Sequence, residues 1–439
     1  MQMTKFKAVL LAIIFIRLCM LSLERHKNIP PDTFRSELWT DRAGYNVFLP
    51  ATFIYSYTAN AFPNEIERKT GEGFNLTTGK IITKYTYGVA LMQLPFFLTA
   101  DFITKYSNYP RDGYSYFYRQ AINIASVFYL VLGLYLLFLA LKAHTKYNSA
   151  ILISTLLLTF FGTNLYYYSI VETGMSHVYS FFLFSFILYI ITNTEGFRYK
   201  LSNKIILSLI VWLSILIRPT NIIFTPILFL WDTSSFQQLF FTFKKKCTFE
   251  NILIYFVSFL IVFSPQLFYW KYAYGSFFTY SYGSEGFSNL FNPYLSEVIF
   301  SPKNGLIPYS IVFVLIIIGI VIMLKHKTAD GIKYLAVVFA VIYLTASWHT
   351  WQFGCGAGMR NMVEYYSLLS FPLSFLIFRL FSVKKIYLKG LLFLTLTFFV
   401  ILNFRTNYNF YGCYFGGTWE WAEYFKTLAY PYKIKSLCY

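Results

Sequence analysis

Long apolar runs separated by short basic clusters extend through the whole of this 439-residue chain. Many of the runs approach the length of about 20 apolar residues that a helix needs to cross a lipid bilayer. We expect eleven such helices, at residues 7–23, 121–142, 150–168, 176–194, 204–217, 221–231, 251–270, 308–324, 331–348, 363–381 and 386–404. The pattern predicts an all-α polytopic membrane protein with about eleven transmembrane helices.

The composition agrees with a membrane location. Hydrophobic residues make up 57% of the chain, aromatic residues 22% and charged residues only 13%. A soluble fold could not hide so much apolar surface, so lipid is the expected solvent. A net charge of +18 would suggest nucleic acid in a soluble protein, but here the basic residues cluster between apolar runs, as topology signals do. We therefore expect a lipid bilayer as a partner and no nucleic acid.

The apolar run at residues 88–106 is ambiguous because it contains Pro95, Asp101 and Lys105. Whether it crosses the membrane decides the side on which every later loop lies. If it does not cross and the N-terminus is cytoplasmic, most Lys and Arg residues of the short loops fall inside, where membrane proteins enrich them. We therefore expect a juxtamembrane or re-entrant helix on the outer side. The alternative is an ordinary span with an unusual charge bias.

This topology divides the chain into a transmembrane domain at residues 1–404 and a short extracytoplasmic tail at residues 405–439. A first outer loop at residues 24–120 and a second large one at residues 271–306 lie on the same side as the tail. Residues assigned to these loops can therefore contribute to one site.

Two carboxylates on the outer side are candidates for catalysis. Asp41 begins the segment Asp-Arg-Ala-Gly-Tyr in the first outer loop and could act as a general base on a hydroxyl group. The alternative is a surface Asp paired with Arg42. Glu172 is the only charge in the short loop between the third and fourth helices, where an anion is costly without a partner. His177 lies nearby, although a single His is more often structural.

Three cations on the same side could bind an anion. Lys84 precedes a tyrosine at the expected membrane surface, which suits either an anionic headgroup or a simple interfacial anchor. Arg218 separates two short apolar helices and either snorkels or faces a polar cavity. Arg360 lies in a Gly-rich segment at a helix start, where backbone N–H groups and a guanidinium suit a phosphate. Glu364, one turn later, could orient Arg360.

The motifs of several enzyme classes are missing from the sequence. It has no Walker, HExxH or GxSxG motif, and its five cysteines show no metal-ligand spacing. Cys355 and Cys413 both fall outside the cytoplasm in the expected topology, where a disulfide between them could form. The remaining carboxylates and cations suit a site that handles a lipid-linked phosphate and a hydroxyl acceptor.

The order of these features resembles the GT-C glycosyltransferases of bacterial membranes, such as protein O-mannosyltransferases and the lipid A aminoarabinose transferase. Each feature is loose by itself, but their succession along the chain is fairly specific. The residues that carry the resemblance are Asp41, Lys84 to Gly88 with the apolar run that follows, Arg119 at the second span, Glu172, Arg218-Pro219, Ser301 to Leu306, and Trp351 to Tyr366.

The resemblance implies a fold, an activity and a set of site residues. A GT-C-like fold has juxtamembrane helices in the first outer loop, and its sugar donor is a polyprenyl phosphate sugar. The acceptor would be a cell-envelope glycan, lipid or protein, and the site would face the exterior of a bacterial inner membrane. Carried over, the catalytic candidates are Asp41 and Glu172, the donor-phosphate candidates are Lys84, Arg119, Arg218 and Arg360, and the supporting candidates are Tyr45, Tyr85, His177, His349 and Glu364.

The sequence departs from this family in two respects. It lacks the large soluble C-terminal domain of some members, and its first acid is a single Asp rather than an Asp-x-Asp or Asp-Glu pair. A divalent metal is therefore not supported, and none is required if Arg and Lys hold the charge of the leaving phosphate.

Two other functions remain open. A polymerase or ligase of lipid-linked glycans usually has a large outer loop late in the chain, whereas the largest one here comes early. A non-enzymatic lipid or sugar transporter needs a polar path, but the spans at residues 121–194 contain few charges. The sugar, the acceptor and the anomeric outcome stay undetermined by the sequence.

Overall fold

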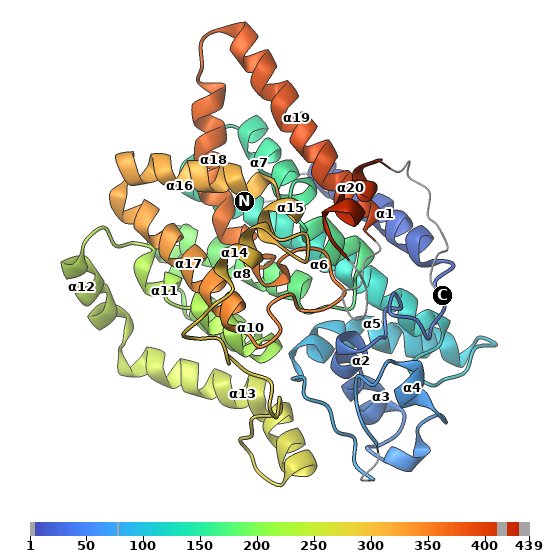
Figure 1. Ribbon diagram of the computed structural model, residues 1–439. Helices are drawn as coiled ribbons and strands as arrows, with labels where there is room; N and C mark the ends of the chain where they lie inside the picture. The colour runs from blue at the N-terminus through green and yellow to red at the C-terminus, as the bar shows by residue number, and fades with distance from the viewer. Residues whose placement is uncertain (1–4, 77–78, 411–418, 430–439) are drawn as a thin grey trace.

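A computed structural model describes residues 5–76, 79–410 and 419–429 (Figure 1). The described residues form helices and connecting loops, with one isolated β-bridge between Asn75 and Ile82 and no longer strand among them. The fold is therefore all-helical over this part of the chain, as the hydrophobic pattern predicts.

The helices follow one another along the chain with few long interruptions; η marks 3-10 helices, except η2, which is a π-helix. The first are α1 (Lys5–His26), α2 (Asp41–Asn46), α3 (Phe48–Phe53), η1 (Ala59–Ala61), α4 (Ile66–Lys69), α5 (Gly88–Lys105), α6 (Tyr116–Thr145) and α7 (Ser149–Phe161). The middle ones are η2 (Tyr167–Val171), α8 (His177–Thr192), α9 (Glu195–Arg198), α10 (Leu201–Ile217), η3 (Pro219–Phe224), α11 (Ile227–Leu230), α12 (Phe236–Lys246) and α13 (Phe249–Tyr274). The last are α14 (Leu295–Phe300), α15 (Leu306–Tyr309), α16 (Val312–His326), α17 (Thr328–Ser347), η4 (Arg360–Met362), α18 (Tyr366–Phe381), α19 (Ile386–Asn409) and α20 (Trp421–Ala429).

Among the described residues, four helices are long and apolar enough to cross a membrane. They are α6, α13, α17 and the segment Tyr387–Asn409 of α19. Shorter apolar segments of 10–17 residues coincide with six further expected spans: α7, α8, α10, Pro219–Leu230, α16 and α18. The helix α5 belongs to neither group. The chain thus has the helices of a polytopic membrane protein, while eleven crossings and their orientation remain predictions.

The predicted helix at residues 150–168 is interrupted, because α7 ends at Phe161 and the π-helix η2 begins only at Tyr167. Asn164 accounts for the break. Its Nδ2 donates to the backbone oxygen of Ala357 over 2.9 Å, and its backbone N–H donates to Ser310 Oγ over 3.1 Å. These distant contacts hold the chain out of a regular helix, and the π-helix η2 that follows leads directly to Glu172.

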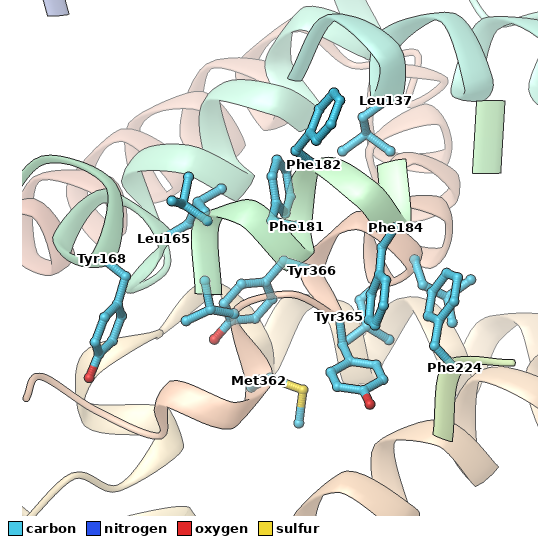
Figure 2. Close-up of a cluster of buried hydrophobic side chains, with 14 of the residues drawn as sticks. Leu137, Leu165, Tyr168, Phe181, Phe182, Phe184, Phe224, Met362, Tyr365 and Tyr366 are labelled. Carbon is cyan, nitrogen blue, oxygen red and sulfur yellow. The ribbon is translucent and has the colours of Figure 1, made fainter. Parts of the chain in front are cut away.

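The core of the molecule is built around α8, which is buried along nearly its whole length and packs against α6, α10 and α18. Figure 2 shows Phe184 of this helix beside Phe224 and Tyr365. The rings of Phe184 and Phe224 stack with their centroids 3.8 Å apart. Such dense aromatic packing makes interiors stiff, so His177 at the start of α8 is held on a rigid element.

The first outer segment folds into a small unit with an apolar cluster of its own. The helices α2, α3 and α4 lie together at the lower right of Figure 1, next to α5. Leu38, Val47, Phe62, Phe74 and Ile81 are buried in this cluster. The cluster fixes α2, and with it Asp41, against the membrane helices.

The expected boundary between membrane domain and tail at residue 404 falls inside a helix, because α19 continues to Asn409. The side-chain amides of two buried asparagines hold the end of this helix in place. Nδ2 of Asn403 donates to the backbone oxygen of Phe161 over 3.0 Å, and Nδ2 of Asn407 donates to that of Tyr309 over 3.1 Å. These bonds fasten the end of α19 to the loops that follow α7 and α15.

The three cysteines among the described residues fall into two groups. Cys19 and Cys247 are free, whereas Cys355 is disulfide-bonded. Cys413, the partner expected from the sequence, lies outside the described residues, so that pairing stays a prediction.

Candidate functional site

Asp41 occupies the first position of α2, directly after Thr40, whose φ of 46° turns the chain sharply into the helix. Its carboxylate accepts hydrogen bonds from Tyr85 Oη and from Nη2 of Arg360, the latter over 3.1 Å. Its side chain is 24% exposed. Asp41 is therefore held between the first outer loop and the Gly-rich segment, with part of its surface open.

Gly44 explains why Tyr85 can reach Asp41. A Cβ at Gly44 would lie 2.2 Å from Cδ2 of Tyr85 and 2.4 Å from the backbone oxygen of Gly73. Only a glycine lets the ring and the neighbouring backbone approach so closely. The Asp-Arg-Ala-Gly-Tyr segment thus combines a carboxylate with the space that its hydrogen-bond partner needs.

The charge state of Asp41 follows from its neighbours. Burial alone would raise its pKa, but Arg360, the hydrogen bond from Tyr85, and the charges of Lys84 and Arg42 together hold the pKa below the usual 3.8. Asp41 is consequently an anion at neutral pH. As an anion it can accept a proton or orient a hydroxyl group.

Glu172 stands at the end of η2 in a different environment. Its Oε1 lies 3.8 Å from Nη1 of Arg42, whereas its Oε2 is buried and has no hydrogen-bond partner among the described residues. Burial raises the pKa of Glu172, although Arg42 and Arg360 lower it, and Asp41 raises it further. Arg42 thus pairs with Glu172. The alternative from the sequence, in which Arg42 pairs with Asp41, is wrong.

Arg218 follows the last residue of α10 and enters a buried polar network. Its Nη1 donates to Oε1 of Glu364 over 2.9 Å, and its Nη2 donates to Oδ1 of Asn361 over 2.5 Å. The expectation that Glu364 orients Arg360 is therefore corrected, because Glu364 binds Arg218.

Nδ1 of His177 lies 3.0 Å from both Nη1 of Arg218 and Oε2 of Glu364. A ring nitrogen can either accept from the guanidinium or donate to the carboxylate, not both at once. His177 thus completes the network around Arg218 and lies within reach of the cavity that this network faces.

Lys84 contacts Glu285 of the second outer loop, a residue that sequence reasoning did not include among the site candidates. Its Nζ lies 2.6 Å from Oε1 of Glu285 and 5.6 Å from the ring centroid of Tyr282. The signal that could have identified Glu285 is an acid between glycines in an outer loop, at Gly283 and Gly286.

Arg119 is placed elsewhere. Its Nε lies 2.7 Å from Oε2 of the buried Glu37, and its Nη2 donates to the backbone oxygen of Ile29. Glu37 also accepts from Asn123, whose side-chain oxygen accepts from Thr173. Arg119 therefore supports the loop next to Glu172 and is not brought to the cations around Asp41.

Two cavities meet at Asp41. The first has a volume of about 320 Å³ and the second about 820 Å³. Both are lined by Asp41, Lys84, Tyr85, Met175, Glu285, Trp348, Phe353 and Arg360. The remaining polar candidates are divided between them: Tyr45, His177, Arg218 and Glu364 line the first, and Arg42, Glu172 and His349 line the second.

Two charged groups lie between the first and second cavities: the ionised carboxylate of Asp41 and the guanidinium of Arg360. The first cavity is also lined by the Arg218 network, and the second is also lined by the buried carboxyl of Glu172. No group of three or more His, Cys, Asp or Glu side chains that could hold a metal ion occurs within the described part of the chain. The charged groups present suit an anion in the first cavity and a hydroxyl group near Asp41.

Comparisons with known proteins give matches in structure alone. No protein-family model and no curated protein matches the sequence. The archaeal oligosaccharyltransferase AglB from Archaeoglobus fulgidus, in complex with an inhibitory peptide and a dolichol-phosphate, is similar with a TM-score of 0.49 and 11% identity over 92% of this chain. The apo form of the Archaeoglobus fulgidus oligosaccharyltransferase gives a TM-score of 0.48 and 13% identity, also over 92% of this chain. The match covers 56% and 57% of those two chains, so this chain spans little more than half their length.

Proposed function

We propose that the protein is a membrane glycosyltransferase that moves a sugar from a polyprenyl-phosphate-linked donor to a hydroxyl group of an acceptor. The reaction takes place on the extracytoplasmic face of a bacterial plasma membrane. One observation carries the proposal. The carboxylate of Asp41 and the guanidinium of Arg360, 3.1 Å apart, line both cavities at once. A base that can act on the acceptor and a cation that can bind the donor phosphate therefore lie side by side where the two cavities join.

The first cavity suits the donor. Arg218 and Arg360 supply two guanidinium groups, the side chains best shaped for phosphate. Ile223, Val341 and Leu344 add apolar wall beside them, from η3 and α17. A polyprenyl phosphate sugar combines a phosphate with a long hydrocarbon chain, so it satisfies both kinds of lining.

The second cavity suits the acceptor because it is larger and lined by polar residues from the first outer loop and the Gly-rich segment. Glu172 and Arg42 lie on its wall with Glu72. The carboxyl of Glu172, with one oxygen free of partners among the described residues, can orient a hydroxyl group. A cell-envelope glycan, lipid or protein could supply that hydroxyl.

In the proposed reaction the acceptor oxygen attacks the anomeric carbon of the sugar. The bond from that carbon to the phosphate oxygen breaks, and the acceptor proton passes to Asp41. The negative charge that develops on the departing polyprenyl phosphate is stabilised by Arg360 and Arg218 in a site where burial strengthens such interactions. The two guanidinium groups perform the charge stabilisation that a metal ion provides elsewhere, so the proposal requires no metal.

The test is a transfer assay with the purified full-length protein in nanodiscs. A panel of polyprenyl phosphate sugars, each radiolabelled in the sugar, is incubated with a cell-envelope extract as the source of acceptors. We expect one donor to lose its label to a product that carries a single added sugar. A ladder of products would indicate a polymerase. A parallel experiment places the protein in sealed vesicles, where label that crosses the membrane without a chemical change would indicate a transporter.

A further inference from the structure

A basic amphipathic helix lies on the side of the molecule opposite the candidate site. The helix is α12, and it directly precedes α13, a candidate membrane span of 26 residues. At about 1.5 Å per residue, α13 is about 39 Å long, and Trp270 near its far end lines the first cavity. The start of α13, and α12 with it, therefore lies at the opposite membrane face. Figure 1 shows α12 at the left edge, away from α2, α3 and α4 at the lower right.

The sequence of α12 gives it one apolar face. The side chain of Ser235 accepts a hydrogen bond from the N–H of Gln238 and caps the helix start. Leu239, Phe240 and Phe243 then recur at a spacing that places them on one side of a helix. These three side chains and residues of α11 enclose an apolar groove of about 430 Å³, lined by Thr225, Pro226, Phe229, Leu230, Leu239, Phe240 and Phe243.

This apolar face is open in the described structure. Phe240 is 60% exposed and Phe243 is 52% exposed, and Phe241, which lies beyond Phe240 around the helix and outside the groove, is 71% exposed. Phe243 makes a ring contact across the groove, with Phe229 at 5.5 Å between centroids. Large exposed apolar groups mark a surface that something else covers, and at the end of a membrane span that cover is the acyl region of the bilayer.

A cluster of lysines adjoins the same face. Lys246 donates to the backbone oxygen of Leu228 and lies 3.9 Å from Asp232, a carboxylate that also binds Arg198 at 2.5 Å. Lys244 lies over the ring of Phe240, 4.7 Å from its centroid, and remains exposed. Lys245 is exposed as well and lies 5.1 Å from the ring of Tyr199. The end of α12 therefore presents two exposed cations beside exposed phenylalanines.

We propose that α12 lies in the interface of the bilayer and binds anionic phospholipid there. Acyl chains occupy the groove between α11 and α12, and the lipid phosphate binds Lys244 and Lys245. A helix with an apolar face and lysines at its edge buries that face at the headgroup boundary, and basic residues near the surface draw anionic lipid. The inference is independent of the proposed transfer reaction. In the topology expected from the charge pattern, this leaflet is the cytoplasmic one.

The experiment is hydrogen–deuterium exchange of the full-length protein in nanodiscs of two compositions. One contains phosphatidylcholine alone, and the other contains phosphatidylcholine with about 30 mole per cent phosphatidylglycerol. We expect the amides of residues 236–246 to exchange about tenfold more slowly in the anionic nanodiscs, because the bound lipid stabilises the helix. The variant K244E/K245E should lose this difference while the core helix α8 stays protected.

The matched control is K384E/K385E, which reverses two exposed lysines where α18 meets α19, at the same end of the membrane helices. This control should keep the slower exchange of residues 236–246. A second variant, F241S, removes an exposed ring that does not line the groove, and it should reduce protection in both compositions. Equal exchange of wild-type residues 236–246 in the two nanodiscs would overturn the proposal. Equal loss in K384E/K385E would do so too, because it would show an effect of overall charge.

Discussion

Nη2 of Arg360 donates a hydrogen bond to Oδ2 of Asp41 over 3.1 Å, although 319 positions separate the two residues in the chain. The pair joins the first outer loop to the Gly-rich segment before α18. Each partner shifts the pKa of the other: Arg360 lowers the pKa of Asp41, and Asp41 raises the pKa of Arg360. In the proposed reaction a phosphate competes with Asp41 for this guanidinium, which frees the carboxylate as the donor binds.

Replacing Arg360 should damage transfer directly. We expect Arg360→Gln to lower kcat/KM by about 100-fold or more, because the charge that stabilises the leaving phosphate is lost. The measurement is the steady-state rate of sugar transfer against donor concentration. Arg111→Gln removes the partner of another aspartate, Asp101, in a pair whose Arg is half exposed. That control should retain nearly full activity, and an equal loss in both variants would contradict the role of Arg360.

The pH dependence of transfer should report on Glu172. Burial raises its pKa above the usual 4.5, while Asp41, with a pKa below 3.8, stays ionised over the same range. If ionised Glu172 orients the acceptor, the rate rises with pH through a window above 4.5 as the carboxyl loses its proton. The variant Glu172→Gln should be slower and should lack this rise. A rise of the same shape in the variant would assign it to another group.

Gly356 should tolerate no side chain. A Cβ there would lie 2.2 Å from Oη of the fully buried Tyr168 and 3.3 Å from Oε2 of Glu172. We expect Gly356→Ala to displace these groups and to lower kcat by about 10- to 100-fold, since small misplacements in a site are costly. Gly286→Ala is the matched control, because its Cβ would meet only Oη of Tyr280 at 3.8 Å. A normal rate in Gly356→Ala would mean that the Glu172 loop adjusts freely.

Arg119 should matter for stability and not for donor binding. It pairs with Glu37, whose side chain is fully buried, and leaving a buried charge without its partner costs about 3–5 kcal/mol. We expect Arg119→Ala to lower the Tm of the purified protein while the KM for the donor stays unchanged in the folded fraction. A raised KM at unchanged Tm would instead support the phosphate role that the family resemblance implies.

Much of the helical framework was predictable because lipid imposes a simple rule on sequence. A segment such as α6 or α17 must be apolar over the thickness of the bilayer, and that requirement is visible without any tertiary structure. The break after α7 was not predictable, since it depends on a hydrogen bond from Asn164 to Ala357, 193 positions away.

For the candidate site, too, part was predictable from the sequence and part depended on the tertiary structure. Unusual charges near membrane helices pointed to Asp41, Lys84, Arg218 and Arg360, and all four line the first cavity. Which cation pairs with which carboxylate was not visible, because Glu364 reaches Arg218 only when α10 and α18 are both packed against α8. Likewise, the glycines on either side of Glu285 mark a turn but do not place it beside Lys84, since its loop is fixed by a backbone bond from His349 to Gly286.

The most direct test of the proposed function compares two aspartates with similar partners. Asp41 is bound by Tyr85 and Arg360, and Asp101 is bound by Tyr118 and Arg111. Only Asp41 lines the two cavities. With the donor identified by the transfer assay, single-turnover rates are measured for Asp41→Asn and Asp101→Asn, each checked for folding by size-exclusion chromatography. The account predicts that Asp41→Asn abolishes transfer while Asp101→Asn transfers at nearly the wild-type rate; full activity in folded Asp41→Asn would contradict it.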